Sequence, residues 1–564
     1  MGLPRKTPRL AMLTGMAFFF LLLLHIMWKS SFSTSDAEPK VYTSGGWDWK
    51  HAKQFYPPDS IKKLPGGKPK TLPKVQAPRS SFKNPGEPDP RREAVEQAFN
   101  KSYASYKKYA WMEDELAPVS GDGKETFGGW AATLVDTLDT LWIMGQKEEF
   151  AEASKAAAAI DFSKTSAGAA NMFETTIRHL GGLLSAYDLS GDKKLLKKAT
   201  ELGEMLYIGF DTPNRLPGFW LNFEDAANGA QRAGTNDPSA SPASLCLEFT
   251  RLSQLTGDPK FYAATDRVTR FLEKTQFKTA LPGIWPTTLD FRNERATETS
   301  FTIGGLADSL YEYLPKMHAL LGGTDDTFEK MYRSSMKLVE EYFLFRPMLP
   351  EKDDILFAGD VRANNGDTVE LIPRGQHLSC FAGGMFGLGG KLLDIDDHVS
   401  IGERLARGCG WAYTQFPTGV MPEIFTLFAC PSLEPCDFDE ALWEKKGDDT
   451  MQKGWKSVRD ARYILRPEAI ESIFLLYRMT GKEDLRDIAW SMWEGIVRST
   501  ETDLAFSAIK SVKAKGTTQK ADSMESFWMA ETLKYFYLIF SPPDHISLDE
   551  YVLNTEAHPF RRPS

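Results

Sequence analysis

The stretch Leu252-Ser253-Gln254-Leu255-Thr256-Gly257-Asp258 ends an apolar-periodic segment with a glycine-centred turn, and a second amphipathic segment follows it. Glycine is favoured just past a helix end because it enters the left-handed conformation at little cost. The turn glycines Gly191, Gly257, Gly323 and Gly390 are 66, 66 and 67 residues apart. This fixed period predicts stacked helical hairpins. Similar turns bring the number of hairpins to seven, and they lie at residues 141–145, 186–192, 318–324, 389–391, 477–482 and 537–541.

Acidic residues lie inside the apolar stripe of the helices that precede these turns. A buried carboxylate is costly unless it is paired or hydrogen-bonded. Acids at one height in a closed ring would converge on a single pocket, whereas in an open solenoid they would form a stripe. We therefore predict an all-α fold, an (α/α)7 barrel with an acidic cavity. The acids in question are Asp136, Asp139, Glu174, Glu248, Asp308, Glu312, Glu468, Glu471 and Glu525.

Structural ion pairs are the alternative interpretation of these acids. Glu174 and Arg178 are four residues apart on one helix face and can simply pair. Glu468 and Glu471 share a face but carry like charges, which ion pairing alone does not explain. The recurrence of the acids favours a common cavity. Clustered acids perturb one another's pKa values and make a seat for a hard cation such as calcium.

The N-terminal part of the chain predicts a membrane anchor. Residues 10–28 are an apolar run with no acidic or basic residue other than one histidine, just long enough to span a bilayer. Basic residues within 1–9 place that tail in the cytosol, although a cleaved signal peptide is the rival interpretation. Residues 29–90 read as a Pro-, Lys- and Ser-rich stem without a core of its own. Helical periodicity starts at the lumenal barrel domain, 91–564, with an N-glycosylation sequon at Asn100.

The five cysteines suit an oxidising compartment. Cys380 and Cys409 lie on either side of the fifth turn, so a helical hairpin could bring them together. Cys430 and Cys436 could close a small loop, and Cys246 reads as a buried free thiol. The sequence contains no zinc spacing, P-loop or nucleophile elbow. A net charge of −9 without a basic patch argues against a nucleic-acid partner.

Several motifs occur together in one order. They are 132–141 (ATLVDTLDTL), 173–178 (FETTIR), 308–314 (DSLYEYL), 377–381 (HLSCF), 465–472 (LRPEAIES), 524–528 (MESFW) and 554–559 (NTEAHP). In these motifs the chain resembles the class I α-1,2-mannosidases, glycoside hydrolase family 47, and its Golgi-type subgroup. The resemblance spans roughly residues 95 to 560. It implies an (αα)7 barrel, in agreement with the seven turns.

The resemblance also implies an inverting exo-hydrolase that uses Ca²⁺ and removes terminal α-1,2-linked mannose from high-mannose N-glycans. The general acid falls on Glu174, the general base on Glu468, and a third essential carboxylate on Asp308. Thr555 matches the calcium ligand, through its hydroxyl and its carbonyl, and Cys380 with Cys409 matches the family's disulfide. The implied residues around the sugar and the calcium are Asp136, Arg178, Glu248, Leu306, Glu312, Glu423, Arg466, Glu471 and Glu525.

The chemistry agrees with this assignment. An inverting glycosidase needs one protonated acid and one carboxylate, far enough apart to admit a water molecule. Acids from different helices across a barrel meet that spacing more easily than neighbours on one helix. Glu174 with Glu468 is therefore a better pair than Glu468 with Glu471.

The C-terminus reads as a plug. Residues 546–553 are predicted to form a short extended run after the last helix. This segment must enter the barrel from one end if Thr555 is to reach the acids. A frayed tail is the alternative, but a terminus rich in Val, Leu, His and Phe disfavours it.

Leu306 predicts the specificity. It stands where ER-type members of the family have an arginine and Golgi-type members a leucine, so the resemblance implies a roomier pocket. We expect trimming to the five-mannose core by a monomer in the Golgi (or ER) membrane, a type II protein whose partners are glycoproteins carrying high-mannose glycans.

Three other functions compete with this prediction. The first is a weakly active or non-hydrolytic glycan-binding relative in ER-associated degradation. A helical solenoid scaffold would explain the turns but not the acids. A different (α/α)-barrel hydrolase would explain both, but not the Asn-Thr-Glu sequence near the C-terminus.

Overall fold

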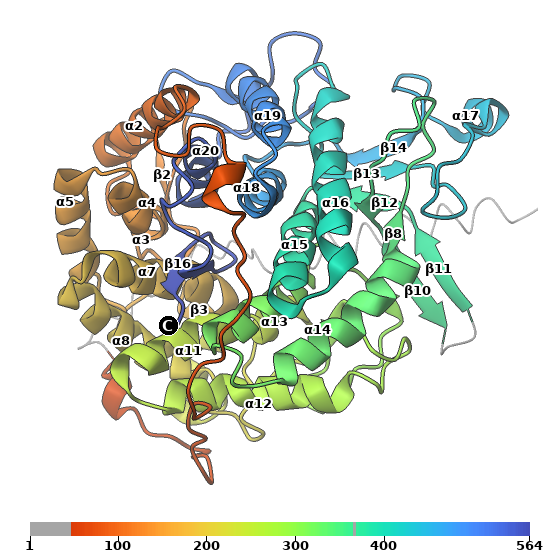
Figure 1. Cartoon of the computed structure of the whole chain (residues 1–564). Helices are drawn as coiled ribbons and strands as arrows, with labels where there is room; N and C mark the ends of the chain where they lie inside the picture. Colours follow the sequence, from red (N-terminus) through yellow and green to blue (C-terminus); the bar gives the residue numbers. More distant parts are fainter. Residues whose placement is uncertain (1–46, 365–367, 564) are drawn as a thin grey trace, which may run out of the picture. The chain divides into compact units, whose positions relative to one another are not determined.

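A closed double ring of helices surrounds the C-terminal segment (Figure 1). The structure is a computed structural model that describes residues 47–364 and 368–563. In this part of the chain, seven inner helical segments alternate with seven outer helices, which confirms the predicted (α/α)7 barrel. The inner segments are α3 (Ala132–Asp136) with α4 (Leu138–Ile143), α6 (Met172–Glu174) with η3 (Thr175–Leu180) and α7 (Gly181–Ser190), α10 (Ala240–Ala243) with α11 (Cys246–Thr256), α13 (Asp308–Leu320), η5 (Leu378–Phe381) with α15 (Ala382–Leu393), α18 (Glu468–Thr480), and η6 (Trp528–Thr532) with α20 (Leu533–Ile539). The outer helices are α2 (Arg91–Tyr109), α5 (Lys147–Ala158), α8 (Lys193–Ile208), α12 (Lys260–Thr275), α14 (Thr327–Leu338) continued by η4 (Val339–Phe343), α16 (Asp396–Thr414) and α19 (Asp484–Thr500).

The two rings differ in how they are buried. Nearly every residue of α13, α18 and α20 is buried, as expected for helices with neighbours on all sides. The outer helices α12 and α14 bury one face and expose the other. The ring closes where α20 packs on α2 and η6 contacts α3 and α4. The last inner segment therefore packs against the first helices of the barrel.

The predicted turns are confirmed at most positions. Gly191, Gly257 and Gly481 end inner helices with φ values of 73°, 76° and 70°. The expectation for Gly390 is wrong, because this residue lies inside α15 and the turn is made by Asp394 with φ of 54°. Gly390 serves packing instead. A Cβ there would lie 2.9 Å from the Cβ of His398 on the outer helix α16.

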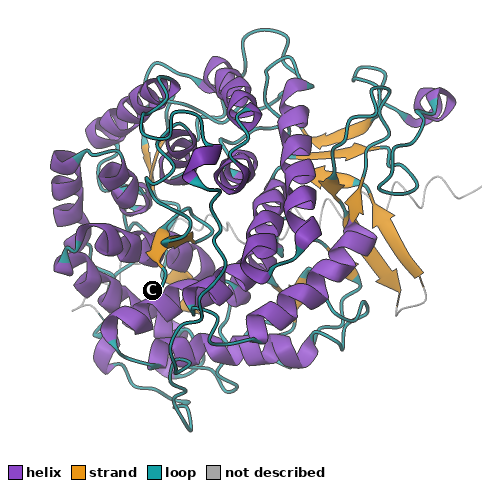
Figure 2. Cartoon of the chain, viewed as in Figure 1, coloured by secondary structure: helices purple, strands orange, loops and turns teal. Residues whose placement is uncertain are grey.

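The strands are short and decorate the helices (Figure 2). The longest of them lie outside the ring near α16. Helices α9 (Phe223–Asn228) and α17 (Glu440–Lys446) are also outside the repeat. The antiparallel sheets are β1 (Glu115–Leu116) with β2 (Gly123–Lys124), β3 (Ala169–Asn171) with β4 (Trp220–Asn222), β5 (Asp237–Pro238) with β6 (Thr288–Leu289), β8 (Leu344–Phe345) with β9 (Phe357–Ala358), β7 (Ser300–Phe301) with β10 (Asp360–Asn364) and β11 (Thr368–Ile372), and β12 (Arg374–Gln376) with β13 (Ile424–Leu427) and β14 (Trp455–Asp460).

The C-terminal hairpin enters the ring, as the sequence predicts. We call residues 551–561 the plug. It consists of β15 (Tyr551–Leu553) paired with β16 (Pro559–Arg561), and its turn contains the fully buried Asn554 and His558. The extended run is shorter than expected, because residues 543–550 form turns and only the last three residues of the predicted stretch are a strand.

The segment before α2 lies against the barrel. Residues 47–90 contain only two short 3-10 turns, η1 (Trp49–His51) and η2 (Arg79–Ser81), yet Trp49, Val75 and Phe82 are buried. Backbone amides of this segment bond to distant elements, for example Lys70 N to Gly322 O at 2.8 Å. The predicted anchor, 10–28, lies outside the described residues. Among those that are described, no helix combines the length and apolar character needed to cross a membrane.

The cysteine predictions are settled by the same structure. Disulfides join Cys380 to Cys409 and Cys430 to Cys436. Cys246 is free and buried in α11. The first bond ties inner helix segment η5 to outer helix α16, as expected for two cysteines on either side of one hairpin.

Candidate active site

The inner helices begin around a cavity of about 350 Å³. Glu174, Asp308 and Glu468 all lie in the first turn of an inner helix and all line it. A helix N-terminus favours a carboxylate there because its free amide groups point toward the charge. The predicted residues that line the cavity are Glu174, Arg178, Leu306, Asp308, Arg466, Glu468, Glu525 and Thr555.

Glu174 is fixed by its own helix start and by Arg178. Asn171 caps α6, and its side-chain oxygen accepts from the backbone N of Glu174 at 3.0 Å. Arg178 donates through Nε to Glu174 Oε2 at 2.8 Å, so the predicted pair forms. Arg178 lies in the π-helical turn η3 and also donates to Ser526 and Glu556. Glu174 keeps 29% of its side chain exposed to the cavity.

Glu468 is held as a carboxylate. Burial alone would raise its pKa, but the hydrogen bond from His377 and the charge of Arg466 lower it below the usual value. The distance from His377 Nδ1 to Glu468 Oε2 is 2.8 Å. The other ring nitrogen of His377 lies 2.8 Å from the hydroxyl of Tyr413.

Asp308 has the opposite environment. Burial raises its pKa to about 7, helped by the nearby Glu312 and Glu468 and opposed by the backbone amide of Ser309. That amide is 2.9 Å from Asp308 Oδ1. The cavity therefore holds one carboxylate kept ionised and one carboxyl that exchanges its proton near neutral pH.

The floor of the cavity, formed in part by Glu531 and Glu556, lies on a layer of further acids. Lys316 pairs with Glu312 and lies 3.7 Å from Glu471. Glu531 and Glu556 share a hydrogen bond, and burial raises the pKa of both, that of Glu556 to about 8. Two hydrogen-bonded carboxyl groups share a proton, so this pair retains a proton near neutral pH unless a cation binds beside it.

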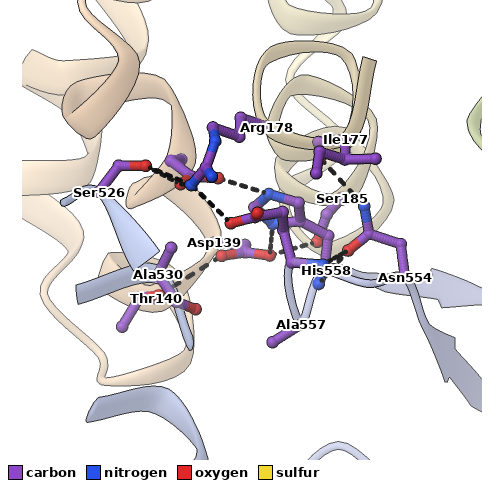
Figure 3. Close-up of polar contacts among 12 residues, drawn as sticks. Asp139, Thr140, Ile177, Arg178, Ser185, Ser526, Ala530, Asn554, Ala557 and His558 are labelled. Carbon is purple, nitrogen blue, oxygen red and sulfur yellow. Dashed lines mark hydrogen bonds and ion pairs between the residues drawn. The ribbon is translucent and has the colours of Figure 1, made fainter. Parts of the chain in front are cut away.

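The plug is anchored in this layer by charged groups (Figure 3). His558 lies 2.8 Å from Asp139 and 2.9 Å from Asp136 through its two ring nitrogens. Burial lowers the pKa of His558, but the two aspartates outweigh it and raise the pKa to about 9. Lys534 bonds to Asp139 at 2.8 Å and to the carbonyl of Ala557. The imidazolium and the ammonium thus hold the turn next to Thr555.

Five predicted residues support the cavity without lining it. Asp136 lies under it, bonded to His558 and Ser526. Burial raises the pKa of Glu248 to about 7, and its Oε1 accepts from Tyr313 and Asn554. Glu423 pairs with Arg466 at 2.5 Å. Glu312 and Glu471 belong to the acidic layer around Lys316.

Sequence reasoning missed four residues of this site. Glu531 and Glu556 line the cavity, and His377 holds Glu468. Glu531 interrupts the apolar run of η6 and α20, the same signal that revealed the other acids. Glu556 follows the predicted Thr555 directly. Phe527, beside the predicted Glu525, also lines the cavity, and its ring lies 5.7 Å from the guanidinium of Arg178.

Comparisons with known proteins agree with this geometry. The sequence profile of glycosyl hydrolase family 47 matches residues 98–562. The mannosyl-oligosaccharide 1,2-alpha-mannosidase MNS1 of Arabidopsis thaliana is 36% identical over 84% of this chain and 78% of that protein. The endoplasmic reticulum mannosyl-oligosaccharide 1,2-alpha-mannosidase of Homo sapiens is 35% identical over 83% of this chain, which spans 64% of the human protein. The structure of the alpha-1,2-mannosidase from Trichoderma reesei matches with a TM-score of 0.77 at 31% identity, over 85% of this chain and 100% of that one.

Proposed function

The chain belongs to glycosyl hydrolase family 47, and we propose that it is a glycosidase that removes terminal α-1,2-linked mannose from high-mannose N-glycans. The observation that carries this proposal is the convergence of Glu174, Asp308 and Glu468 from three inner helices on one cavity. The surroundings of Asp308 and Glu468 shift their pKa values in opposite directions, as acid–base catalysis requires of paired carboxyl groups.

We assign the reaction to inversion at the anomeric carbon. Glu468, kept ionised by His377 and Arg466, takes a proton from a water molecule as its oxygen attacks C1. The bond from C1 to the leaving oxygen breaks, and that oxygen receives the proton of Glu174. Arg178 holds Glu174 in place, and Asp308 adjusts the charge of the cavity by gaining or losing a proton near neutral pH.

A bound calcium ion fits the floor of this cavity. No group of three or more His, Cys, Asp or Glu side chains among the described residues is arranged to hold a metal directly. The fit rests instead on Thr555, which would supply hydroxyl and carbonyl oxygens, and on the carboxyl oxygens of Glu531 and Glu556, which line the same cavity. A calcium held by one threonine and several waters is oxygen-rich, as this ion prefers. When bound, it supplies positive charge that orients sugar hydroxyls and water.

We place the enzyme in the secretory pathway, as a type II protein of the Golgi (or ER) membrane anchored by residues 10–28. A human relative is named for the endoplasmic reticulum, and the two disulfides fit an oxidising lumen. Asn100, exposed on α2, is the proposed glycosylation site, and its side-chain oxygen accepts from Gln146.

The test is hydrolysis of a nine-mannose N-glycan by the full chain purified in mild detergent, followed by proton NMR. β-Mannose as the first product and accumulation of the five-mannose glycan are expected. α-Mannose as the first product would overturn inversion. Glycan binding without any release would assign the chain to the glycan-binding relatives.

A further inference from the structure

Residues 69–82, which we call the strap, cross the end of the ring opposite to the cavity (Figure 1). The cavity lies at the first turns of the inner helices, whereas the strap reaches the turns at their other ends. Lys70 N donates to Gly322 O at 2.8 Å, and Ser81 lies against Gly481. The ring thus has an open end with the cavity and a closed end covered by the strap and by the chain that leads into the plug.

One carboxylate oxygen of that chain accepts two backbone amides of the strap. Val75 N donates to Asp549 Oδ1 at 2.7 Å, and Gln76 N donates to the same oxygen at 3.2 Å. Asp549 lies two residues before strand β15 of the plug. A carboxylate that accepts backbone amides makes a strong, directional contact.

The side chain of Gln76 adds three bonds across the same gap. Its Nε2 donates to the carbonyl of Pro543 at 3.0 Å. Its Oε1 accepts from the backbone N of Leu548 at 3.0 Å and from Nη1 of Arg478 at 3.2 Å. We call residues 543–550, which precede the plug, the turn region. The side-chain amide of Gln76 therefore joins the strap to inner helix α18 and to both ends of the turn region.

Arg478 completes the contact from inside the ring. This arginine on α18 is fully buried, and no carboxylate lies within ion-pair distance among the described residues. It donates instead to the carbonyls of Leu538, Pro543 and His545. These bonds of its two Nη groups fix the turn region that Gln76 also contacts, whereas its buried Nε has no partner among the described residues.

We infer that Gln76 and Asp549 are positioning residues, through which the strap holds the outer end of the plug and sets the place of Thr555 in the cavity floor. His558, labelled in Figure 3, holds the plug from inside, and Asp549 holds it from outside; Thr555 lies between these two residues in the chain. The consequence for catalysis rests on the proposed function, whereas the mechanical coupling does not.

The test measures hydrogen exchange of the plug amides in the calcium-free full chain. Asp549→Ala removes the acceptor of both strap amides, and exchange of residues 551–561 should quicken about tenfold. Asp549→Asn keeps an acceptor oxygen and should restore the slow exchange. Glu550→Ala is the matched control, since this exposed neighbour makes no side-chain bond, and it should leave exchange unchanged.

A second variant keeps the test valid if Asp549→Ala does not fold. Gln76→Ala should also quicken plug exchange, severalfold, against the control Lys74→Ala on the exposed side of the strap. Faster exchange in the strap alone, with the plug unchanged in both variants, would overturn the inference. In the mannosidase assay, Asp549→Ala should raise the calcium concentration for half-maximal activity about fivefold while kcat at saturating calcium is retained. Equal loss of kcat at every calcium concentration would contradict the positioning role. If the unmodified chain released no mannose, the proposed function would fail, but the exchange experiment would still decide the coupling.

Discussion

The two ends of the ring are built on different principles. At the open end, carboxyl groups from separate helices face one cavity, and several lack a cationic partner. At the closed end, the strap and the turn region are joined by amides, backbone carbonyls and the carboxylates of Asp549 and Asp544, and each of these carboxylates accepts a hydrogen bond. Groups that are poorly satisfied cost stability and are typical of sites that bind or react, whereas satisfied groups fix structure. Substitutions at the two ends should therefore separate activity from stability.

The largest expected effect is loss of activity at the open end without loss of stability. Glu468→Gln should lower kcat by about a thousandfold or more, because the amide cannot accept a proton from water. Its oxygen can still accept from His377, so the free energy of unfolding should stay within about 1 kcal/mol. Initial rates and urea unfolding measure the two quantities. Glu434→Gln, at an exposed acid far from the cavity, is the control. If the thousandfold loss of kcat came with a loss of several kcal/mol in the free energy of unfolding, the proposed difference between the two ends would be wrong.

A large stability effect is expected where the plug meets the inner helices. His558→Gln removes the cation between Asp136 and Asp139 and should cost about 3–5 kcal/mol of unfolding free energy, because two buried carboxylates lose a partner. Urea unfolding at pH 6.5 tests this, with His545→Gln as the control, a histidine whose side chain hydrogen-bonds to the carbonyl of Ile143 and to no carboxylate among the described residues. An unchanged unfolding free energy would show that the plug does not depend on this ion pair.

The same residue predicts a pH dependence of stability. The pKa of His558 is raised from 6.5 to about 9, so its stabilisation is complete below pH 6.5 and is lost as the pH rises through 9. The wild type should lose about 3 kcal/mol from this group over that range, and His558→Gln should lose correspondingly less. Parallel pH profiles of the two proteins would contradict the assignment.

A tenfold effect on activity is expected from Asp308. Burial raises its pKa to about 7, so the carboxyl ionises between about pH 6 and 8. If the ionised form assists catalysis, kcat/KM should rise with pH by about tenfold over this window. Asp308→Asn should abolish this limb, while Asp503→Asn, an exposed control, should retain it. An unchanged limb in Asp308→Asn would assign the titration to another group.

The smallest effect concerns specificity at the mouth of the cavity. Leu306 lines the cavity, and 54% of the residue is exposed. Leu306→Arg introduces a cation that can grip one glycan branch, so removal of the later mannoses should slow about fivefold while the first is removed at a similar rate. Chromatography of the glycan products over time measures this. Uniform slowing of all steps would indicate a general disturbance of the loop instead.

The open end could be predicted from the sequence because its acids stand at helix positions where apolar residues are expected. Acids such as Glu174 and Glu468 interrupt apolar stripes, and turn glycines such as Gly191 mark helix ends. The use of glycine as a marker of helix ends failed at Gly390. The sequence alone does not distinguish a glycine needed for close helix packing from one needed for a turn. It also failed to separate acids in the cavity wall from acids beneath it, such as Asp136, since both interrupt an apolar stripe.

The closed end could not be predicted in this way. Residues 69–82 have no periodicity, and their partners lie hundreds of positions away, as Gln76 and Leu548 do. Such contacts depend on the finished ring and leave no local pattern in the chain. The composition of residues 29–90 predicted a stem without a core of its own and gave no sign that residues 47–90 pack against the barrel.

The most direct test of the account is mannose release from a nine-mannose N-glycan by the full chain, before and after calcium is removed with a chelator and then restored, with Glu468→Gln measured alongside. We expect mannose release to stop when calcium is removed and to return when calcium is restored. We expect no release by Glu468→Gln under any of these conditions. Release that continues without calcium, or that survives in Glu468→Gln, would contradict the site described at the open end of the ring.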